Sequence, residues 1–246
     1  MQGLMQDMVP LSSERHKDAS ISRDAGFSFS NKMTHVPVLL SELQSLSRDY
    51  ATGFLQADDK IALVAVLGLQ AEENLYVDQK GSWAVSYIPA MLRQYPFAAL
   101  VDNQSEKSKA VLCVASGFEG LNNEGRGQPL FDAEGKPTKL TMSAREFVSQ
   151  TSADAQRTES FARMLRDRDL LVPLKAILQG PEGETRGLEG LYVASKKAVD
   201  ALSAEDLKTM QQSGALAAIH THLASIANLQ ALANRIRKSE ASVFDA

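Results

Sequence analysis

The chain has 246 residues, of which 44% are hydrophobic and 23% are charged, and this balance is typical of a globular protein rather than a disordered or fibrous one. The formal net charge of -4 provides no broad positive field for phosphate backbones, so general nucleic-acid binding is disfavoured, although a local basic patch stays open. The longest apolar run, residues 61–69, is about half a membrane span, so no transmembrane segment is predicted.

Two features bear on location. The amino terminus lacks the apolar core of a secretory signal. The single cysteine, Cys113, lies in an apolar run and is predicted to be a buried side chain on a strand rather than a reactive thiol. One cysteine cannot form an intrachain disulfide, which fits a reducing compartment. We therefore expect a cytoplasmic protein.

The first part of the chain is predicted to hold an arm and three strands. Residues 1–33 are polar and are broken by Pro10 and Gly26, so we expect an extended N-terminal arm that packs on the body through Phe27 and Phe29. Strands are predicted at 36–40, 61–69 and 75–78. The second of these is a continuous apolar run rich in β-branched residues, which favours a buried central strand.

The next segment, residues 83–97, is predicted to contain a short helix. Two prolines, one placed for the first turn and one for the end, delimit it. Tyr87, Met91 and Tyr95 would then lie on one helical face, which is the usual pattern of core residues.

The middle of the chain is predicted to combine a strand, a helix and a hairpin. We expect a strand around Cys113, a helix from Ser143 to about Arg168 with a break near Ser152, and a hairpin of 174–178 and 188–193 around the turn 179–183. The helix is indicated by a capping-box pattern at its start. The hairpin is indicated by apolar runs on both sides of Gly and Pro residues.

The C-terminal region is predicted to be helical. One helix begins at Ser203 and ends at Gly214, and a longer one follows over 215–237, where apolar residues recur every three or four positions. These elements predict an α+β fold with a mixed or antiparallel sheet. We expect one globular domain over 34–238, preceded by the arm and followed by a tail at 239–246.

One spacing suggests catalysis. Tyr192 and Lys196 have the Tyr-x-x-x-Lys pattern of short-chain dehydrogenases, in which a nearby ammonium lowers the pKa of the phenol. Such enzymes also need an early glycine-rich turn for a dinucleotide, and none occurs near the amino terminus. Tyr192 is predicted to lie in a strand, where residues four apart do not pair. We therefore predict no cofactor.

The histidines give no metal site. His220 and His222 lie two apart on a predicted helix, so they point about 200° apart around its axis and cannot chelate one ion together. The Cys and His spacings of zinc and non-haem iron sites do not occur. No metal is predicted.

The candidate binding residues centre on an aromatic and basic cluster in a chain that is only 6% aromatic. Arg93 could pair with a carboxylate or stack on a ring. The candidates are Trp83, Tyr87, Arg93 and Tyr95, together with Glu189 and Tyr192. No catalytic residue can be assigned.

Several short runs follow one another in a distinctive order. They are VPLSSERH (9–16), FSF (27–29), VAVLGL (64–69), ENLYVD (73–78), WAVSYIPA (83–90), LRQYPF (92–97), PLFD (129–132), LEGLY (188–192) and the helix at 217–232. In this order they resemble the SapC-like family of bacterial proteins over residues 9 to about 235. The family is named after a surface-array (S-layer) protein locus. The resemblance implies no established activity, and the occurrence of some members near flavin-dependent halogenases and outer-membrane receptors hints at an accessory role.

Three hypotheses follow. The leading one is a binding or accessory protein linked to surface-layer or nutrient-uptake systems, whose small-molecule or protein partner contacts residues 83–97. The second is an enzyme of unrecognised type that acts on a small molecule or a protein side chain through Glu73, Arg93, Glu189 and Tyr192. The third is a helix-turn-helix made by 203–213 and 215–237, which the acidic balance disfavours. Partner identity and oligomeric state stay open.

Overall fold

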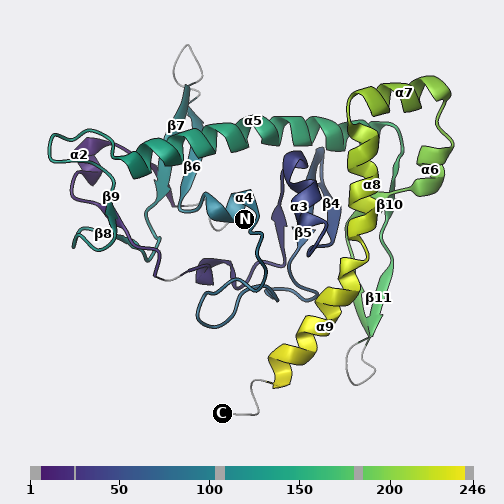
Figure 1. Ribbon diagram of the computed structural model, residues 1–246, viewed down its shortest axis with the longest axis horizontal. Helices are drawn as coiled ribbons and strands as arrows, with labels where there is room; N and C mark the ends of the chain where they lie inside the picture. The colour runs from purple at the N-terminus through teal and green to yellow at the C-terminus, as the bar shows by residue number, and fades with distance from the viewer. Residues whose placement is uncertain (1–6, 25, 103–108, 180–184, 242–246) are drawn as a thin grey trace.

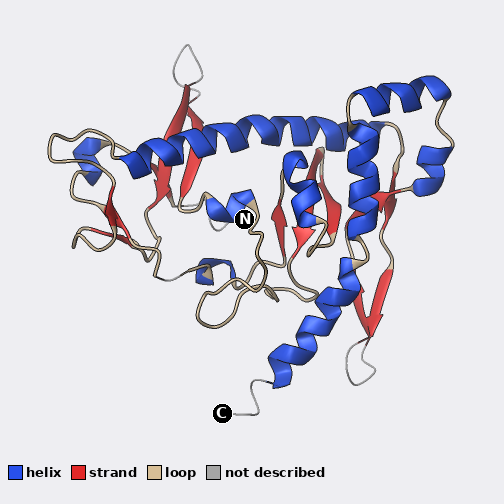
Figure 2. Ribbon diagram, in the orientation of Figure 1, coloured by secondary structure: helices blue, strands red, loops and turns tan. Residues whose placement is uncertain are grey.

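The longest helix, α5 (Lys139–Asp167), runs along the long axis of the molecule and connects its two parts (Figure 1). The computed structural model describes residues 7–24, 26–102, 109–179 and 185–241. Antiparallel strands lie against each half of α5, and the last of the C-terminal helices runs away from it (Figure 2). The predicted α+β class with a helical C-terminal region is confirmed.

The larger sheet has five antiparallel strands in the order β10-β13-β4-β5-β3. These are β3 (His35–Pro37), β4 (Thr52–Ala57), β5 (Lys60–Val66), β10 (Leu171–Pro173) and β13 (Leu191–Ala194). The strand predicted at 61–69 is confirmed as an internal strand. It ends at Val66, because the N–H groups of Leu67 and Gly68 both donate to the carbonyl of Thr34 and bend the chain away.

The other two predicted strands are shorter than expected. β3 stops at Pro37, and the chain enters η2 (Leu40–Glu42) and α3 (Leu43–Leu46). The carboxylate of Glu42 accepts the N–H of Leu39 and so caps this helical turn. The segment 75–78 contributes only a β-bridge between Val77 and Trp83.

The N-terminal residues form part of a second β region. Its elements are β1 (Met8–Pro10), β2 (Ser20–Ile21), β6 (Phe97–Asp102), β7 (Lys109–Ala115), β8 (Leu121–Asn122) and β9 (Gln128–Pro129), with the helical turns α2 (Ser13–His16) and η1 (Ser28–Ser30). β1 pairs with β7, and β2 lies between β8 and β9. Phe27 and Phe29 pack against the larger core. The described part of the predicted arm therefore lies along the body.

The helix predicted within 83–97 is reduced to one turn, α4 (Ala90–Arg93). Pro89, which precedes the helix, has a ψ of 140°, outside the helical range, so the helix begins only at Ala90. As a result Tyr87 precedes the helix and Tyr95 follows it. The predicted helical stripe of Tyr87, Met91 and Tyr95 is therefore wrong.

The helix α5 begins earlier than predicted and is not broken. Ser143 lies inside its first turns rather than at its cap, and the hydroxyl of Ser152 donates to the carbonyl of Val148 one turn back. This bond lets a serine sit within a helix without interrupting it. The predicted break near Ser152 is therefore wrong.

The predicted hairpin of 174–178 and 188–193 is confirmed in two sections. β11 (Ala176–Gln179) pairs with β12 (Thr185–Leu188), and further along β10 pairs with β13. The turn predicted at 179–183 lies mostly outside the described residues. The short α6 (Lys196–Asp200) follows β13.

The C-terminal helices are α7 (Ala204–Gln212), α8 (Ala215–Ser225) and α9 (Asn228–Ala241). Ser203 caps α7 as predicted, and Gly214 separates α7 from α8 at a φ of 78°. The single helix predicted over 215–237 is wrong, because the side chain of Asn228 donates to the carbonyls of Ser47 and Tyr50 and fixes a break before α9.

The buried apolar side chains form two clusters. The larger one lies between the five-stranded sheet, the end of α5 and the C-terminal helices, and the smaller one lies among β2, β6, β7 and the start of α5. Val148 of α5 belongs to the smaller cluster, whereas Phe161 and Leu165 belong to the larger. The connection between β5 and β6, which carries four candidate residues, crosses from one cluster to the other. The division into arm, domain and tail stays a prediction.

Candidate functional site

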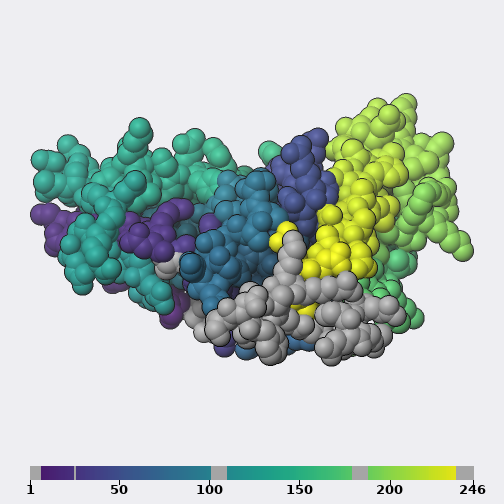
Figure 3. Space-filling view, turned by 60° about the horizontal axis from the view of Figure 1, so that its bottom comes forward, coloured from purple at the N-terminus to yellow at the C-terminus, as the bar shows by residue number. Residues whose placement is uncertain are grey.

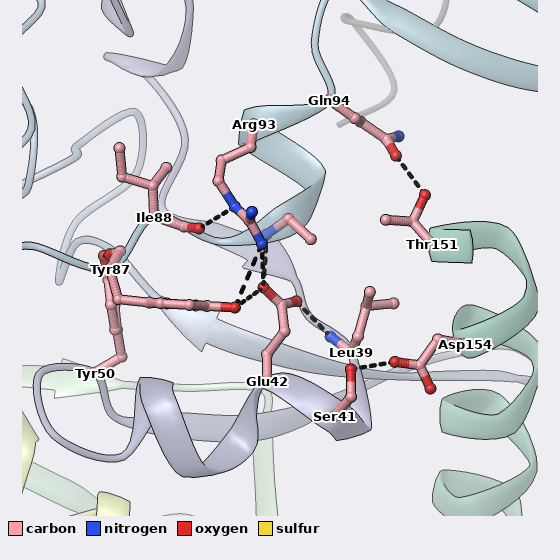
Figure 4. A network of polar contacts seen from close by, with 11 residues as sticks. Leu39, Ser41, Glu42, Tyr50, Tyr87, Ile88, Arg93, Gln94, Thr151 and Asp154 are labelled. Carbon is pink, nitrogen blue, oxygen red and sulfur yellow. Dashed lines mark hydrogen bonds and ion pairs between the residues drawn. The ribbon is translucent and has the colours of Figure 1, made fainter. Parts of the chain in front are cut away.

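A buried carboxylate, Glu42, organises the polar groups around α4. Only 4% of Glu42 is exposed. Its Oε1 accepts the hydroxyl of Tyr87 at 2.8 Å and the N–H of Ala90 at 2.7 Å, and its Oε2 accepts the N–H of Leu39 at 2.9 Å. Figure 4 shows these groups converging on the end of η2. A buried charge needs this many partners to offset its lost hydration.

Arg93 supplies the opposite charge at the surface of this network. Its Nη2 lies 3.9 Å from Oε1 of Glu42, and its Nε donates to the carbonyl of Ile88 at 2.9 Å. The guanidinium carbon also lies 5.5 Å from the ring centre of Tyr87 and 5.1 Å from that of Phe147 on α5. Two rings, one carbonyl and one carboxylate therefore fix the orientation of the guanidinium.

Tyr87 is held as a neutral donor. Burial and, as the smaller cause, the negative charge of Glu42 raise the pKa of its phenol to about 12. The hydroxyl therefore stays protonated at neutral pH and donates to Glu42. It cannot act as a general base there, because its proton is already committed to the carboxylate.

Trp83 and Tyr50 support the backbone of this region. The indole N–H of Trp83 donates to the hydroxyl of Tyr50 at 2.7 Å, and this hydroxyl donates to the carbonyl of Tyr87 at 2.5 Å. Tyr50 also stacks on Tyr76 with ring centres 4.5 Å apart. Burial raises the pKa of Tyr50 above its ordinary value. Trp83 thus positions the loop that carries Tyr87.

A cleft of about 340 Å³ adjoins Arg93 between α4 and α5. We call it the Arg93 cleft. Its lining combines two guanidinium groups and a carboxamide with an apolar floor. The lining residues are Arg23, Arg93, Gln94, Phe97, Leu140, Ser143, Ala144, Phe147 and Val148.

Gln94 is fixed at the edge of this cleft. It is 9% exposed, and its Oε1 accepts the hydroxyl of Thr151 at 2.8 Å (Figure 4). Among the described residues, no protein group accepts from Nε2 of Gln94, from Nη1 of Arg93 or from the guanidinium of Arg23. The cleft therefore presents donors whose acceptors the described protein does not supply.

Tyr95 lies apart from the Arg93 cleft. Its ring packs on Phe29 at a tilt of 32° with centres 4.2 Å apart and meets the edge of Phe118 at 5.4 Å. These three residues line a second cleft. The four clustered candidates therefore do not form one site. Trp83 and Tyr87 belong to the hydrogen-bond network behind Arg93, Arg93 borders one cleft, and Tyr95 borders another.

The remaining candidates lie elsewhere. Glu189 is exposed and borders a cleft beside β3 and β5, whose lining includes neither Glu73 nor Tyr192. Tyr192 lies in β13 opposite Phe54, and Glu73 accepts the N–H groups of Leu69 and Gln70. These side chains therefore do not form one site with Arg93.

The residues that suggested other chemistry do not assemble into a site. Lys196 begins α6 and pairs with Asp200 at 2.5 Å, while Tyr192 lies in a strand, so the Tyr-x-x-x-Lys pair is not assembled. His220 is exposed and His222 is buried, as their spacing predicts. Across the described ranges, no group of three or more His, Cys, Asp or Glu side chains is placed to hold a metal ion.

Several site residues were missed by the sequence analysis. Glu42 and Tyr50 occur in a polar stretch with no motif, and Arg23 and Gln94 lack any distinguishing pattern. Phe147 was expected only as part of a helix. The one usable signal was the density of aromatic residues around Arg93.

Comparison with known proteins identifies the family but no individual relative. No curated protein and no solved structure shows a significant match to this chain. Within the described residues, every helix is too short or too polar to cross a membrane. A family model described as SapC matches residues 11–232. Because this match spans most of the sequence, the chain belongs to the SapC family.

Proposed function

We propose that this chain is a binding protein that holds a small carboxylate with an apolar body in the Arg93 cleft. The observation that carries the proposal is a fixed guanidinium and a fixed carboxamide, both with unused donors, above an apolar floor. Ligand sites commonly combine a mostly apolar lining with a few placed polar groups.

The donors favour a carboxylate over a more highly charged anion. Nε and Nη2 of Arg93 are committed to Ile88 and Glu42, so Nη1 remains, and Gln94 contributes Nε2. Two fixed donors match the two oxygens of one carboxylate. Glu42 already offsets the charge of Arg93, which leaves little surplus positive charge for a phosphate dianion.

The apolar floor of the cleft would bind the apolar body of the ligand. Phe97 and Val148 are buried core residues, and Phe147 presents a partly exposed ring beside the guanidinium. An aliphatic or aromatic group of the ligand would displace water from these side chains, with roughly 25 cal/mol gained for each Å² of apolar surface covered.

Binding is favoured over catalysis. The described lining of the Arg93 cleft contains no carboxylate, histidine or cysteine that could move a proton or attack a substrate. Glu42 lies behind Arg93 with both oxygens engaged. An accessory role linked to surface-layer or nutrient-uptake systems is part of the proposal and is supported by the family resemblance alone. A cytoplasmic location is also part of the proposal and is supported by the single cysteine, which fits a reducing compartment.

Calorimetric titration with phenylacetate tests the proposal. We expect phenylacetate to bind at least tenfold more tightly than its neutral analogue phenylacetamide, because a charge-assisted hydrogen bond contributes about 1.5 to 3 kcal/mol. Acetate, which lacks the ring, should also bind more weakly. Equal affinity for phenylacetate and phenylacetamide would refute a carboxylate site.

Variants locate the binding. Arg93→Gln should abolish the preference for phenylacetate, and the matched change Arg163→Gln, at an exposed arginine of α5 paired with Glu159, should leave it intact. Because Arg93 also neutralises Glu42, the exposed Arg23→Gln provides a variant that keeps the network and should weaken phenylacetate about threefold. An unchanged affinity in both cleft variants would place the ligand elsewhere.

A further inference from the structure

The second cleft, beside Tyr95, has a different chemistry from the Arg93 cleft. It measures about 320 Å³ and has aromatic walls. The rings of Phe29 and Tyr95 pack at a tilt of 32° with centres 4.2 Å apart, and the ring of Phe118 is nearly perpendicular to that of Tyr95, at 87°. Three rings from separate parts of the chain therefore meet at one cleft. In Figure 3 these parts, coloured purple, blue and teal, adjoin on one face of the molecule.

Two carboxylates lie at this cleft. Glu119 lines it directly. Asp7 reaches it from the N-terminal segment, where its Oδ2 lies 3.3 Å from the position that a β-carbon on Gly117 would occupy. Burial and, as smaller causes, the negative charges of Asp7 and Glu119 raise the pKa of Tyr95. Both carboxylates are therefore close enough to interact electrostatically with the ring of Tyr95 in the wall of this cleft.

The negative charge of this cleft has no counterpart in the described protein. Neither Asp7 nor Glu119 forms an ion pair with any described residue, and the described lining includes no Lys, Arg or His. The rim offers the hydroxyl of Ser28 and the carboxamide of Asn31. The faces of aromatic rings also carry negative potential. Rings and carboxylates together favour a positively charged guest.

We propose that the Tyr95 cleft, lined by Phe29, Tyr95, Phe118 and Glu119 with Asp7 beside it, binds an organic ammonium group. Aromatic rings attract ammonium ions through their faces, and carboxylates add longer-range attraction. A divalent metal ion fits less well, because such ions require several converging oxygen ligands rather than rings. The volume suits a small quaternary or primary ammonium compound.

Titration with choline tests this inference. Choline should bind saturably, with shifts in the NMR signals of the Tyr95 and Phe118 rings. The neutral isostere 3,3-dimethylbutanol should bind at least tenfold more weakly, because it has the same shape without the charge. Butylammonium distinguishes a primary from a quaternary ammonium guest. If it binds more tightly than choline, the cleft prefers a primary ammonium group, and if it binds more weakly, the cleft prefers a quaternary one. Equal binding of choline and the alcohol would overturn the proposal.

Carboxylate variants assign the effect to this cleft. Glu119→Gln should weaken choline about threefold, and Asp7→Asn with Glu119→Gln about tenfold. The exposed Glu134→Gln, which lies outside the cleft, serves as the matched control. All three changes are at exposed positions, so thermal unfolding should be nearly unchanged. Retention of full choline affinity in the double variant would contradict the assignment.

The ammonium site stands apart from the proposed carboxylate site. Arg93→Gln should leave choline affinity within about twofold of the parent protein, and the double carboxylate variant should leave phenylacetate affinity unchanged. Loss of choline binding alone would therefore overturn only the inference about the Tyr95 cleft, whereas loss of phenylacetate binding alone would overturn only the proposed function.

Discussion

Two buried polar networks join distant parts of this chain, and they differ in what they leave unused. In the His222 network, Nε2 of His222 accepts the N–H of Ala194 at 3.1 Å, so Nδ1 carries the proton and donates to Thr52 at 2.9 Å. The Thr52 hydroxyl then donates to Ser225 at 2.7 Å, and Ser225 donates to the carbonyl of His222. These hydrogen bonds form a closed loop from His222 through Thr52 and Ser225 back to His222.

The Glu42 network is open at one end. The carboxylate of Glu42 is saturated by its protein donors, but the arginine that balances it keeps a donor toward a cleft. The carboxamide of Gln94 likewise accepts a hydrogen bond through its oxygen, while its N–H donors have no acceptor in the described protein. Burial and hydrogen bonding alone therefore do not mark a binding site. Unused donors at a cleft do, because a buried structural network is normally satisfied within the protein.

The largest effect is expected from Glu42→Gln. The amide would place donors against the N–H of Leu39 or of Ala90 and would leave Arg93 without its anion. We expect the free energy of unfolding to fall by about 3 kcal/mol, as measured by urea denaturation. The exposed Glu146→Gln on α5 should change it by less than about 0.5 kcal/mol. A similar small change for Glu42→Gln would contradict a saturated buried carboxylate.

The next effect concerns pH and the closed network. Burial lowers the pKa of His222 to about 4, below its ordinary value of 6.5. Between these values the unfolded chain binds a proton that the folded chain does not, so the free energy of unfolding should fall as pH falls from 6.5 to 4, by roughly 3 kcal/mol. His222→Gln should remove this part of the slope. Parallel curves for the two proteins would show that His222 titrates normally.

Thr52→Val separates structure from binding. Valine keeps the shape but leaves Nδ1 of His222 without an acceptor, so unfolding should become easier by about 2 kcal/mol. Phenylacetate affinity should stay the same, because this network does not reach the Arg93 cleft. A parallel loss of affinity would show that the two networks are coupled.

Thr151→Val makes the matched change in the open network. It removes the hydroxyl that holds Gln94, with an expected cost of about 1 kcal/mol to stability. Phenylacetate affinity should fall about threefold, because the carboxamide is no longer oriented. If affinity is unaffected, Gln94 does not contact the ligand.

Local patterns predicted the regular elements better than the site. The apolar run of β5, the hairpin residues and the Ser203 cap of α7 act over a few neighbours, so spacing reveals them. The error before α9 came from distant hydrogen bonds, those of Asn228 to Ser47 and Tyr50. Tertiary contacts there override local propensity.

The candidate site could be predicted only in part for the same reason. Aromatic density drew attention to Arg93, but the bond from Ala90 to Glu42 spans 48 residues and that from Thr151 to Gln94 spans 57. No spacing rule connects such positions. Glu42 looks like an ordinary exposed acid in sequence, because its burial depends on the chain returning at α4.

The most direct test is an NMR titration of the protein with phenylacetate that follows both networks at once. The side-chain amide of Gln94 and the Nε–H of Arg93 should shift in a saturable way, while the ring nitrogens of His222 stay fixed. Movement of the His222 signals without those of Gln94 and Arg93, or no movement in either network, would contradict a ligand site at the open network.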